Sequence, residues 1–95
     1  MVGRSGRVLA FRDIDPVAPV HVLLIPKQHV RSAAELGEDD GELLGELFGL
    51  AGRIAAQEGL DGWRLLTNVG GSGGQAVPHL HFHLVGGRPM GWPPG

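Results

Sequence analysis

The sequence predicts an α+β fold: an antiparallel sheet of four to five strands with one long helix packed on it, assembled into a homodimer. Short segments with alternating or continuous apolar residues, at both ends of the chain, are typical of strands. One central segment instead repeats apolar residues at three- and four-residue steps, as a helix does. The chain has 95 residues, which is the length of a single domain with a modest core that an oligomer would enlarge.

The first third of the chain predicts two strands. Residues 1–6 carry no pattern and are expected to be a frayed start. Residues 7–14 alternate, which places Phe11 and Asp13 on the same face of a strand. Prolines at positions 16 and 19 predict a turn. The second strand is the apolar run 21–26, which begins at His21.

The middle of the chain predicts the helix. Ser32 and Glu35 have the spacing of a capping box and indicate a short helical turn. The main helix is expected over 38–58, and Gly59 fits a left-handed C-terminal cap. Its apolar stripe consists of Leu43, Leu44, Leu47, Leu50, Ala51, Ile54 and Ala55.

The last third predicts two more strands within the same domain, which spans 1–95. Residues 63–69 form the third strand, and residues 70–74 form a glycine-rich loop. The fourth strand runs from 78 or 79 to 85 with strict alternation. Residues 88–95 contain three prolines and are expected to be an extended C-terminal arm.

Composition excludes several classes of protein. The formal net charge is −2, which argues against a broadly basic nucleic-acid-binding protein. Cysteine is absent, so disulfides, thiolate zinc sites and a cysteine nucleophile are excluded. No apolar run approaches the ~20 residues of a membrane span, and no secretory signal is visible. We therefore expect a cytoplasmic protein with no membrane partner.

Three histidines fall at alternate positions: His79, His81 and His83. On a strand they share one face, spaced by roughly 6.6 Å, while the residues between them enter the core. Such a row can supply a nucleophile, an acid–base partner and an orienting hydrogen bond. The competing interpretation is a metal site made by these three side chains, with His21 as a fourth ligand. No acidic residue lies near the row in the sequence.

The loop before this row is suited to an anion. Glycines at 70, 71, 73 and 74 let backbone N–H groups approach a phosphate closely. Asn68 and Gln75 add neutral side-chain donors at its two ends. A flexible hairpin connection is the alternative interpretation.

The motif His79-Leu80-His81-Phe82-His83-Leu84-Val85 resembles the histidine triad family. The likeness extends to 11–16, 21–29, Asn68 and 73–75. The ending, 86–90 with Trp92-Pro93-Pro94-Gly95, is similar to the nucleotide-binding branch of the purine nucleoside phosphoramidase type.

The resemblance implies hydrolysis of a purine nucleoside 5′-phosphoramidate, without metal or cofactor. His81 would attack the α-phosphorus and form a nucleotidyl-His81 intermediate, which water would release as the monophosphate. His83 would contact the phosphate and assist the leaving amine. His79 and His21 would complete the histidine system that orients His81.

The resemblance also assigns substrate contacts, some of which have a simpler alternative. Asn68, Gln75 and the backbone at Gly74 would hold phosphate oxygens or the leaving group. Asp13 would bind the ribose, or else cap the following turn. The base pocket would be lined by Phe11, Ile14 and Leu23. For Phe11 and Leu23 the alternative is a place in the core alone.

Two departures from the family pattern affect this interpretation. Family members usually carry a further segment before the first strand, which contributes to the base pocket, and we expect this chain to lack it. Ala76 stands where a hydroxyl residue is common, so one phosphate contact is lost. The alternatives are therefore a nucleotide-binding or scaffold protein with little turnover, and a metal-binding protein. In the predicted homodimer, Trp92 crosses to the partner and lines the leaving-group side of its site.

Overall fold

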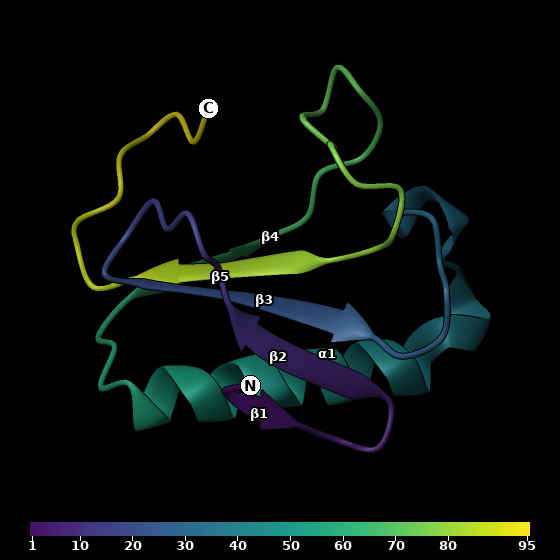
Figure 1. The fold of residues 1–95 in the computed structure, drawn as a ribbon, viewed down its shortest axis with the longest axis horizontal. Helices are drawn as coiled ribbons and strands as arrows, with labels where there is room; N and C mark the ends of the chain where they lie inside the picture. The colour runs from purple at the N-terminus through teal and green to yellow at the C-terminus, as the bar shows by residue number, and fades with distance from the viewer.

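A computed structural model describes residues 1–95 as an antiparallel sheet with one helix packed on it (Figure 1). The sheet has five strands in the order β1-β2-β3-β5-β4. The central strand β3 therefore lies between β2 and β5, the last strand in the sequence. The strands are β1 (Gly3–Arg4), β2 (Val8–Arg12), β3 (Val20–Pro26), β4 (Trp63–Leu66) and β5 (Phe82–Gly86). The helix α1 is Gly41–Gln57. The α+β class predicted from the sequence is confirmed.

The two faces of the sheet have different environments. Helix α1 covers one face, where its apolar stripe packs on alternate residues of β2, β3 and β5, including Val8, Val22 and Leu84. In Figure 1 the loop 13–19, the loop 67–80 and the C-terminal arm all rise on the opposite side of the sheet from α1. The chain therefore has one closed, apolar face and one face left open for a site.

The N-terminal residues are ordered, which corrects the expected frayed start. Gly3 pairs with Ala10, and Arg4 with Leu9, to make the short edge strand β1. Ser5 then donates a hydrogen bond of 3.0 Å from its hydroxyl to Glu46 of α1. No apolar periodicity announces this strand, because two residues are too few to show one.

Three other boundaries differ from the predicted ones. Residues Glu38–Asp40 form a 3₁₀ turn, and the α-helix begins only at Gly41. The third long strand stops at Leu66 rather than at 69. The last strand starts at Phe82, so two of the three alternating histidines precede it. No helix of the molecule is long and apolar enough to cross a membrane.

Candidate active site

The site lies on the open face of the sheet, where β3 and β5 run side by side. Their register pairs Leu23 with His83 and His21 with Val85. Because side chains alternate along a strand, residues 21 and 23 and residues 83 and 85 all project on the face away from α1. The sheet thus brings together histidines that are 62 positions apart in the sequence.

The hydrogen bonds of His21 assign the tautomers of two rings. The backbone N–H of Val17 donates to Nδ1 of His21 over 3.2 Å, so the proton of the neutral His21 ring is on Nε2. That Nε2–H donates to Nδ1 of His83 over 2.9 Å. The proton of His83 is then on its Nε2, which is buried and has no partner within the chain. This N–H is therefore the one buried side-chain group of the cluster that still needs a hydrogen-bond partner.

The charge state of His83 follows from the same surroundings. Burial lowers the pKa of His83, and the neighbouring rings of His81 and His21 lower it further. The carboxylate of Asp13 opposes these effects without cancelling them. The ring is consequently neutral at pH 7, which agrees with the tautomer that the hydrogen bonds assign.

His81 presents the complementary nitrogen. Its Nδ1 donates to the backbone oxygen of His79 over 2.7 Å, which leaves a lone pair on Nε2. The rings of His81 and His83 lie edge to face, with centroids 5.1 Å apart. The backbone oxygen of His81 itself accepts a 2.7 Å hydrogen bond from the hydroxyl of Thr67, a residue that the sequence analysis did not single out. His81 is thus fixed by its ring and by its backbone.

His79 does not join the other two triad rings, which differs from the predicted common row. Its Nδ1 lies 3.2 Å from Nδ1 of His29, and its Nε2 lies 3.2 Å from the backbone oxygen of Pro26. His79 precedes β5 and contacts His29, but it lies on the same open side as His81 and lines the same hollow. His79 orients His81 through its carbonyl, and His21 contacts His83 rather than His81.

Asp13 enters the cluster from the end of β2, although no acidic residue is near it in the sequence. Its Oδ2 lies 3.4 Å from Nε2 of His21, while its Oδ1 accepts a 2.8 Å hydrogen bond from the N–H of Asp15. Asp13 therefore does cap the following turn, as the alternative interpretation predicted, and it also contacts His21. Asp13, His21 and His83 offer ligand atoms within 4.8 Å of one another, and these are the residues that could hold a metal ion. They are a different set from the three alternating histidines.

The glycine-rich loop uses most of its own donors. Gln75 accepts from the N–H of Gly70 and donates to two backbone oxygens, so its amide holds the loop together. The N–H of Gly74 donates to the oxygen of Gly71. Asn68 makes no side-chain hydrogen bond within the chain and lies beside Gly74, where a Cβ would be 3.7 Å from its Cγ. Of the three predicted phosphate contacts, the Asn68 side chain is the one left free.

Two hollows open beside the histidines. The first, of about 290 Å³, is lined by His81, His79 and the apolar residues Leu23, Ile25 and Val77. Phe11 lies opposite Leu23 in the neighbouring strand, on the same face. The second hollow, of about 270 Å³, contains His21, His83 and Asn68, together with residues that the sequence analysis did not use, among them Arg64, Arg88 and Met90.

Among the predicted substrate contacts, only Leu23 and Asn68 line a hollow. The others line neither hollow: Phe11, Asp13, Ile14, Gly74, Gln75 and Trp92. The side chain of Ile14 is fully exposed and lines neither hollow. Trp92 is 86% exposed and is likewise not part of its own chain's site. Ile25, which lines the first hollow, could have been found, because it follows Leu23 by two positions in the same apolar strand.

Comparison with known proteins agrees with this fold. The sequence model of the HIT domain, the histidine triad domain, matches residues 1–90. The match covers nearly the whole chain, including every strand, the helix and the histidine cluster. The protein belongs to the HIT family.

Individual relatives cover the chain almost completely. A HIT family hydrolase from Legionella pneumophila has a solved structure with a TM-score of 0.95 and 49% identity, covering 99% of this chain and 86% of its own. A Zea mays protein named 14 kDa zinc-binding protein is 52% identical, over 100% of this chain and 77% of its own. A hypothetical histidine triad nucleotide-binding protein from Sulfolobus tokodaii has a TM-score of 0.77 and 37% identity, covering 90% of this chain and 58% of its own. The named hydrolase supports an enzyme of the hydrolase kind.

Proposed function

We propose that this protein cleaves the P–N bond of purine nucleoside 5′-phosphoramidates through a nucleotidyl-His81 intermediate, releasing a nucleoside monophosphate and an amine. The observation that carries the proposal is a pair of complementary free nitrogens. His81 Nε2 offers a lone pair, and His83 Nε2 offers an N–H without a partner. The nucleotide-binding name of the Sulfolobus relative and the hydrolase name of the Legionella relative support the substrate class and the reaction type.

In the first step, the lone pair of His81 Nε2 forms a bond to the α-phosphorus. The electron pair of the P–N bond passes to the amine nitrogen, which takes a proton from solvent in the open hollow and leaves as a neutral amine. The carbonyl of His79 stabilises the positive charge that develops on the His81 ring, because it accepts from Nδ1–H. His83 Nε2–H and the Asn68 amide donate to the phosphoryl group.

In the second step, water attacks the phosphorus and the bond to His81 Nε2 breaks. The monophosphate leaves, and the proton lost by the water replaces the one consumed by the amine. The apolar hollow beside His81 suits a flat base, with Leu23 and Ile25 on its sheet side. Phe11, in the neighbouring strand opposite Leu23, would extend this apolar surface. Asp13, which contacts His21, would accept hydrogen bonds from the ribose hydroxyls.

The intermediate provides the decisive experiment. The protein is mixed with an adenosine 5′-phosphoramidate, quenched and digested, and the peptide containing His81 is examined by mass spectrometry for an added nucleotidyl group. His81→Ala should lose both the adduct and the turnover while keeping the fold, because the ring faces the open side of the sheet. Substantial turnover by His81→Ala would disprove the nucleophile. Affinity for the monophosphate without any turnover by the unaltered protein would instead indicate the binding or scaffold function.

Metal binding is the second candidate, because Asp13, His21 and His83 gather in space. A metal ion there would have to replace the 2.9 Å hydrogen bond between the two rings, so the present geometry favours the metal-free reaction. Turnover should therefore be unchanged after treatment with a strong chelator. A large loss that added zinc restores would identify the protein as a metal-dependent one.

A further inference from the structure

The second hollow carries chemistry that the hydrolysis of a simple phosphoramidate does not use. It lies on the open face beside His83, has a volume of about 270 Å³ and contains two arginines, Arg64 and Arg88. Asn68, which has no side-chain partner, also lines it. The first hollow, beside His81, has no arginine or lysine in its lining.

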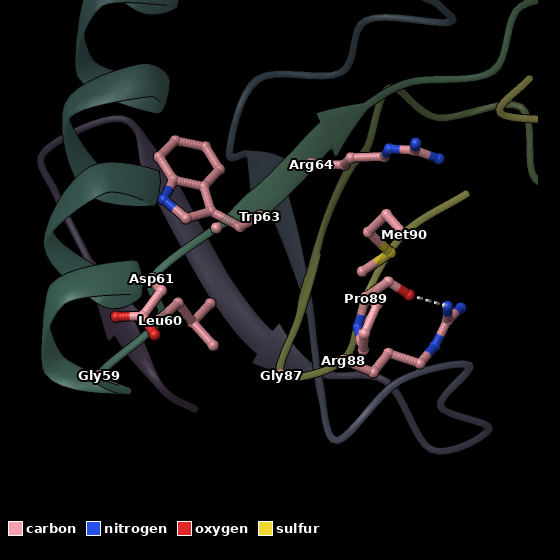
Figure 2. Close-up of a pocket in the computed structure, with 10 residues that line it drawn as sticks. Gly59, Leu60, Asp61, Trp63, Arg64, Gly87, Arg88, Pro89 and Met90 are labelled. Carbon is pink, nitrogen blue, oxygen red and sulfur yellow. Dashed lines mark hydrogen bonds between the residues drawn. The ribbon is translucent and has the colours of Figure 1, made fainter. Parts of the chain in front are cut away.

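The fold explains how both arginines reach this place. Leu66 of β4 pairs with His83 of β5, and Arg64 pairs with Val85 two positions further along. Residues two positions apart share a face, so Arg64 lies next to His83 on the open side. Arg88 follows β5 after a turn at Gly87, whose φ of 90° suits glycine. Figure 2 shows the Arg64 and Arg88 side chains on the same side of the strands as Met90, away from the helix.

Neither guanidinium is neutralised by a carboxylate. Arg64 donates to the backbone oxygen of Gly91, and Arg88 donates to those of Val17 and Pro89 over 3.1 Å each. The ion pairs of the molecule involve other arginines, and no acidic residue lines the hollow. A guanidinium has five N–H donors, so most of them remain available. The hollow is consequently positive and has donors available for an anion.

The expected position of the substrate's α-phosphorus indicates which hollow takes the base and which takes the leaving amine. His81 lines one hollow and His83 the other, so a phosphorus bound between these rings has an apolar hollow on one side and a positive hollow on the other. The first suits the base. The second is left for the group that departs with the amine nitrogen.

We propose that Arg64 and Arg88 select substrates whose leaving amine carries an anionic group, in the simplest case a carboxylate. This inference rests on the proposed hydrolysis of phosphoramidates and adds the class of leaving group. A carboxylate accepts two parallel hydrogen bonds from a guanidinium, a geometry that a neutral amide cannot match.

The test compares two substrates that differ only in this charge. They are adenosine 5′-phosphoramidates of β-alanine and of its amide, 3-aminopropanamide. The unaltered protein should show kcat/KM about tenfold or more higher for the carboxylate, as expected for a charge-assisted hydrogen bond. Arg64→Gln and Arg88→Gln should each lower the carboxylate rate several-fold more than the amide rate. Arg64→Lys, which retains the charge, should keep part of the preference.

Arg53→Gln is the matched control, because Arg53 is exposed on α1, far from the open face, and has no ion pair. It should change neither rate. Equal loss on both substrates in the Arg64 and Arg88 variants would overturn the proposal, since the arginines would then serve the common phosphoryl group or the fold. Equal rates of the two substrates with the unaltered protein would overturn it as well.

Binding separates this inference from the proposed reaction. The affinities of both phosphoramidates for His81→Gly are measured by calorimetry, where no turnover is needed. A preference for the carboxylate that disappears in His81→Gly/Arg64→Gln supports the anionic site even if the unaltered protein cleaves neither compound. Equal affinities for the two compounds would exclude the site even if both are cleaved.

Discussion

The chemical role of each histidine in this site depends on which of its ring nitrogens carries the proton. The bond from Val17 N–H fixes the His21 tautomer, and through it the His83 tautomer. The same hydrogen-bonding logic leaves His81 Nε2 without a proton. The sequence predicts that these rings lie on one face of the sheet. It does not predict the hydrogen bonds to the backbone that determine which ring nitrogen carries the proton. That distribution is what distinguishes a nucleophile from its neutral neighbour.

The lowered pKa of His83 predicts how stability depends on pH. Since the folded protein binds a proton to this ring less readily than the unfolded chain does, the unfolded state gains protons first as pH falls. The stabilisation is fully present above about pH 6.5, the ordinary value for histidine, and is lost as the pH falls below it. Urea unfolding of the unaltered protein and of His83→Asn between pH 8 and 5 measures this. The variant should show the shallower decline, and parallel curves would contradict the assignment.

His29 is expected to act on the reaction without touching the substrate. Its Nδ1 donates to Nδ1 of His79, whose other nitrogen donates to the Pro26 oxygen, and the His79 carbonyl holds His81. Loss of one such hydrogen bond is worth ~0.5–1.5 kcal/mol, so His29→Ala should lower kcat about two- to tenfold. KM should be unchanged, and His29→Asn, which keeps a donor nearby, should recover most of kcat. A change confined to KM would show that His29 contacts the substrate instead.

At the scale of elements, the sequence predicted the core more accurately than the strand ends. Leu80, Phe82 and Leu84 are buried as the alternation requires. The strand itself begins only at Phe82, because the N–H of Leu80 donates to the oxygen of Val30 rather than to a neighbouring strand. The alternation of apolar residues predicts which side chains are buried. It does not predict the hydrogen-bond partner of each backbone N–H and C=O group. The contacts of His79 with His29 and Pro26 could not be predicted for that reason.

The loop 70–74 gives a test with its control in the same segment. A Cβ at Gly73 would lie 2.1 Å from the backbone oxygen of Val69, which no local adjustment of a side chain relieves. A Cβ at Gly71 would have nothing within 4 Å, and the φ of Gly71 is not positive. Gly73→Ala should therefore displace Asn68 and reduce kcat/KM by an order of magnitude or more, while Gly71→Ala retains nearly full activity. Similar activities of the two variants would show that the loop does not position the site.

For the whole molecule, the exposed surfaces favour the predicted homodimer. The strand β4 is at an edge of the sheet, so its outer backbone groups have no partner in the chain. Phe48 of α1 and Trp63 of β4 are 57% and 41% exposed. We expect light scattering to give the mass of a dimer at micromolar concentration and Phe48→Asp to weaken it. A monomer mass for the unaltered protein would contradict the predicted homodimer.

The C-terminal arm supplies the last prediction, which depends on that dimer. The indole of Trp92 is 86% exposed, whereas the arm's root is fixed by the hydrogen bond from Arg64 to Gly91. An aromatic ring of this size is stabilised by burial, and we expect a dimer to bury it against the partner's site. Deleting residues 91–95 should therefore lower kcat/KM and alter leaving-group preference while the dimer persists. If kcat/KM and the leaving-group preference were unchanged, the arm would have no role in the reaction.

Because Pro94 lines the hollow of its own chain, the deletion alone does not say which subunit the arm serves. Mixed dimers of a His81→Ala subunit and a Trp92→Ala subunit separate the two cases. The one intact nucleophile then belongs to the subunit without the indole, and an arm that crosses supplies Trp92 from the other subunit. Turnover per intact His81 should return to the value of the unaltered protein, above that of the Trp92→Ala homodimer. If the mixed dimer is no faster per site than that homodimer, Trp92 does not cross.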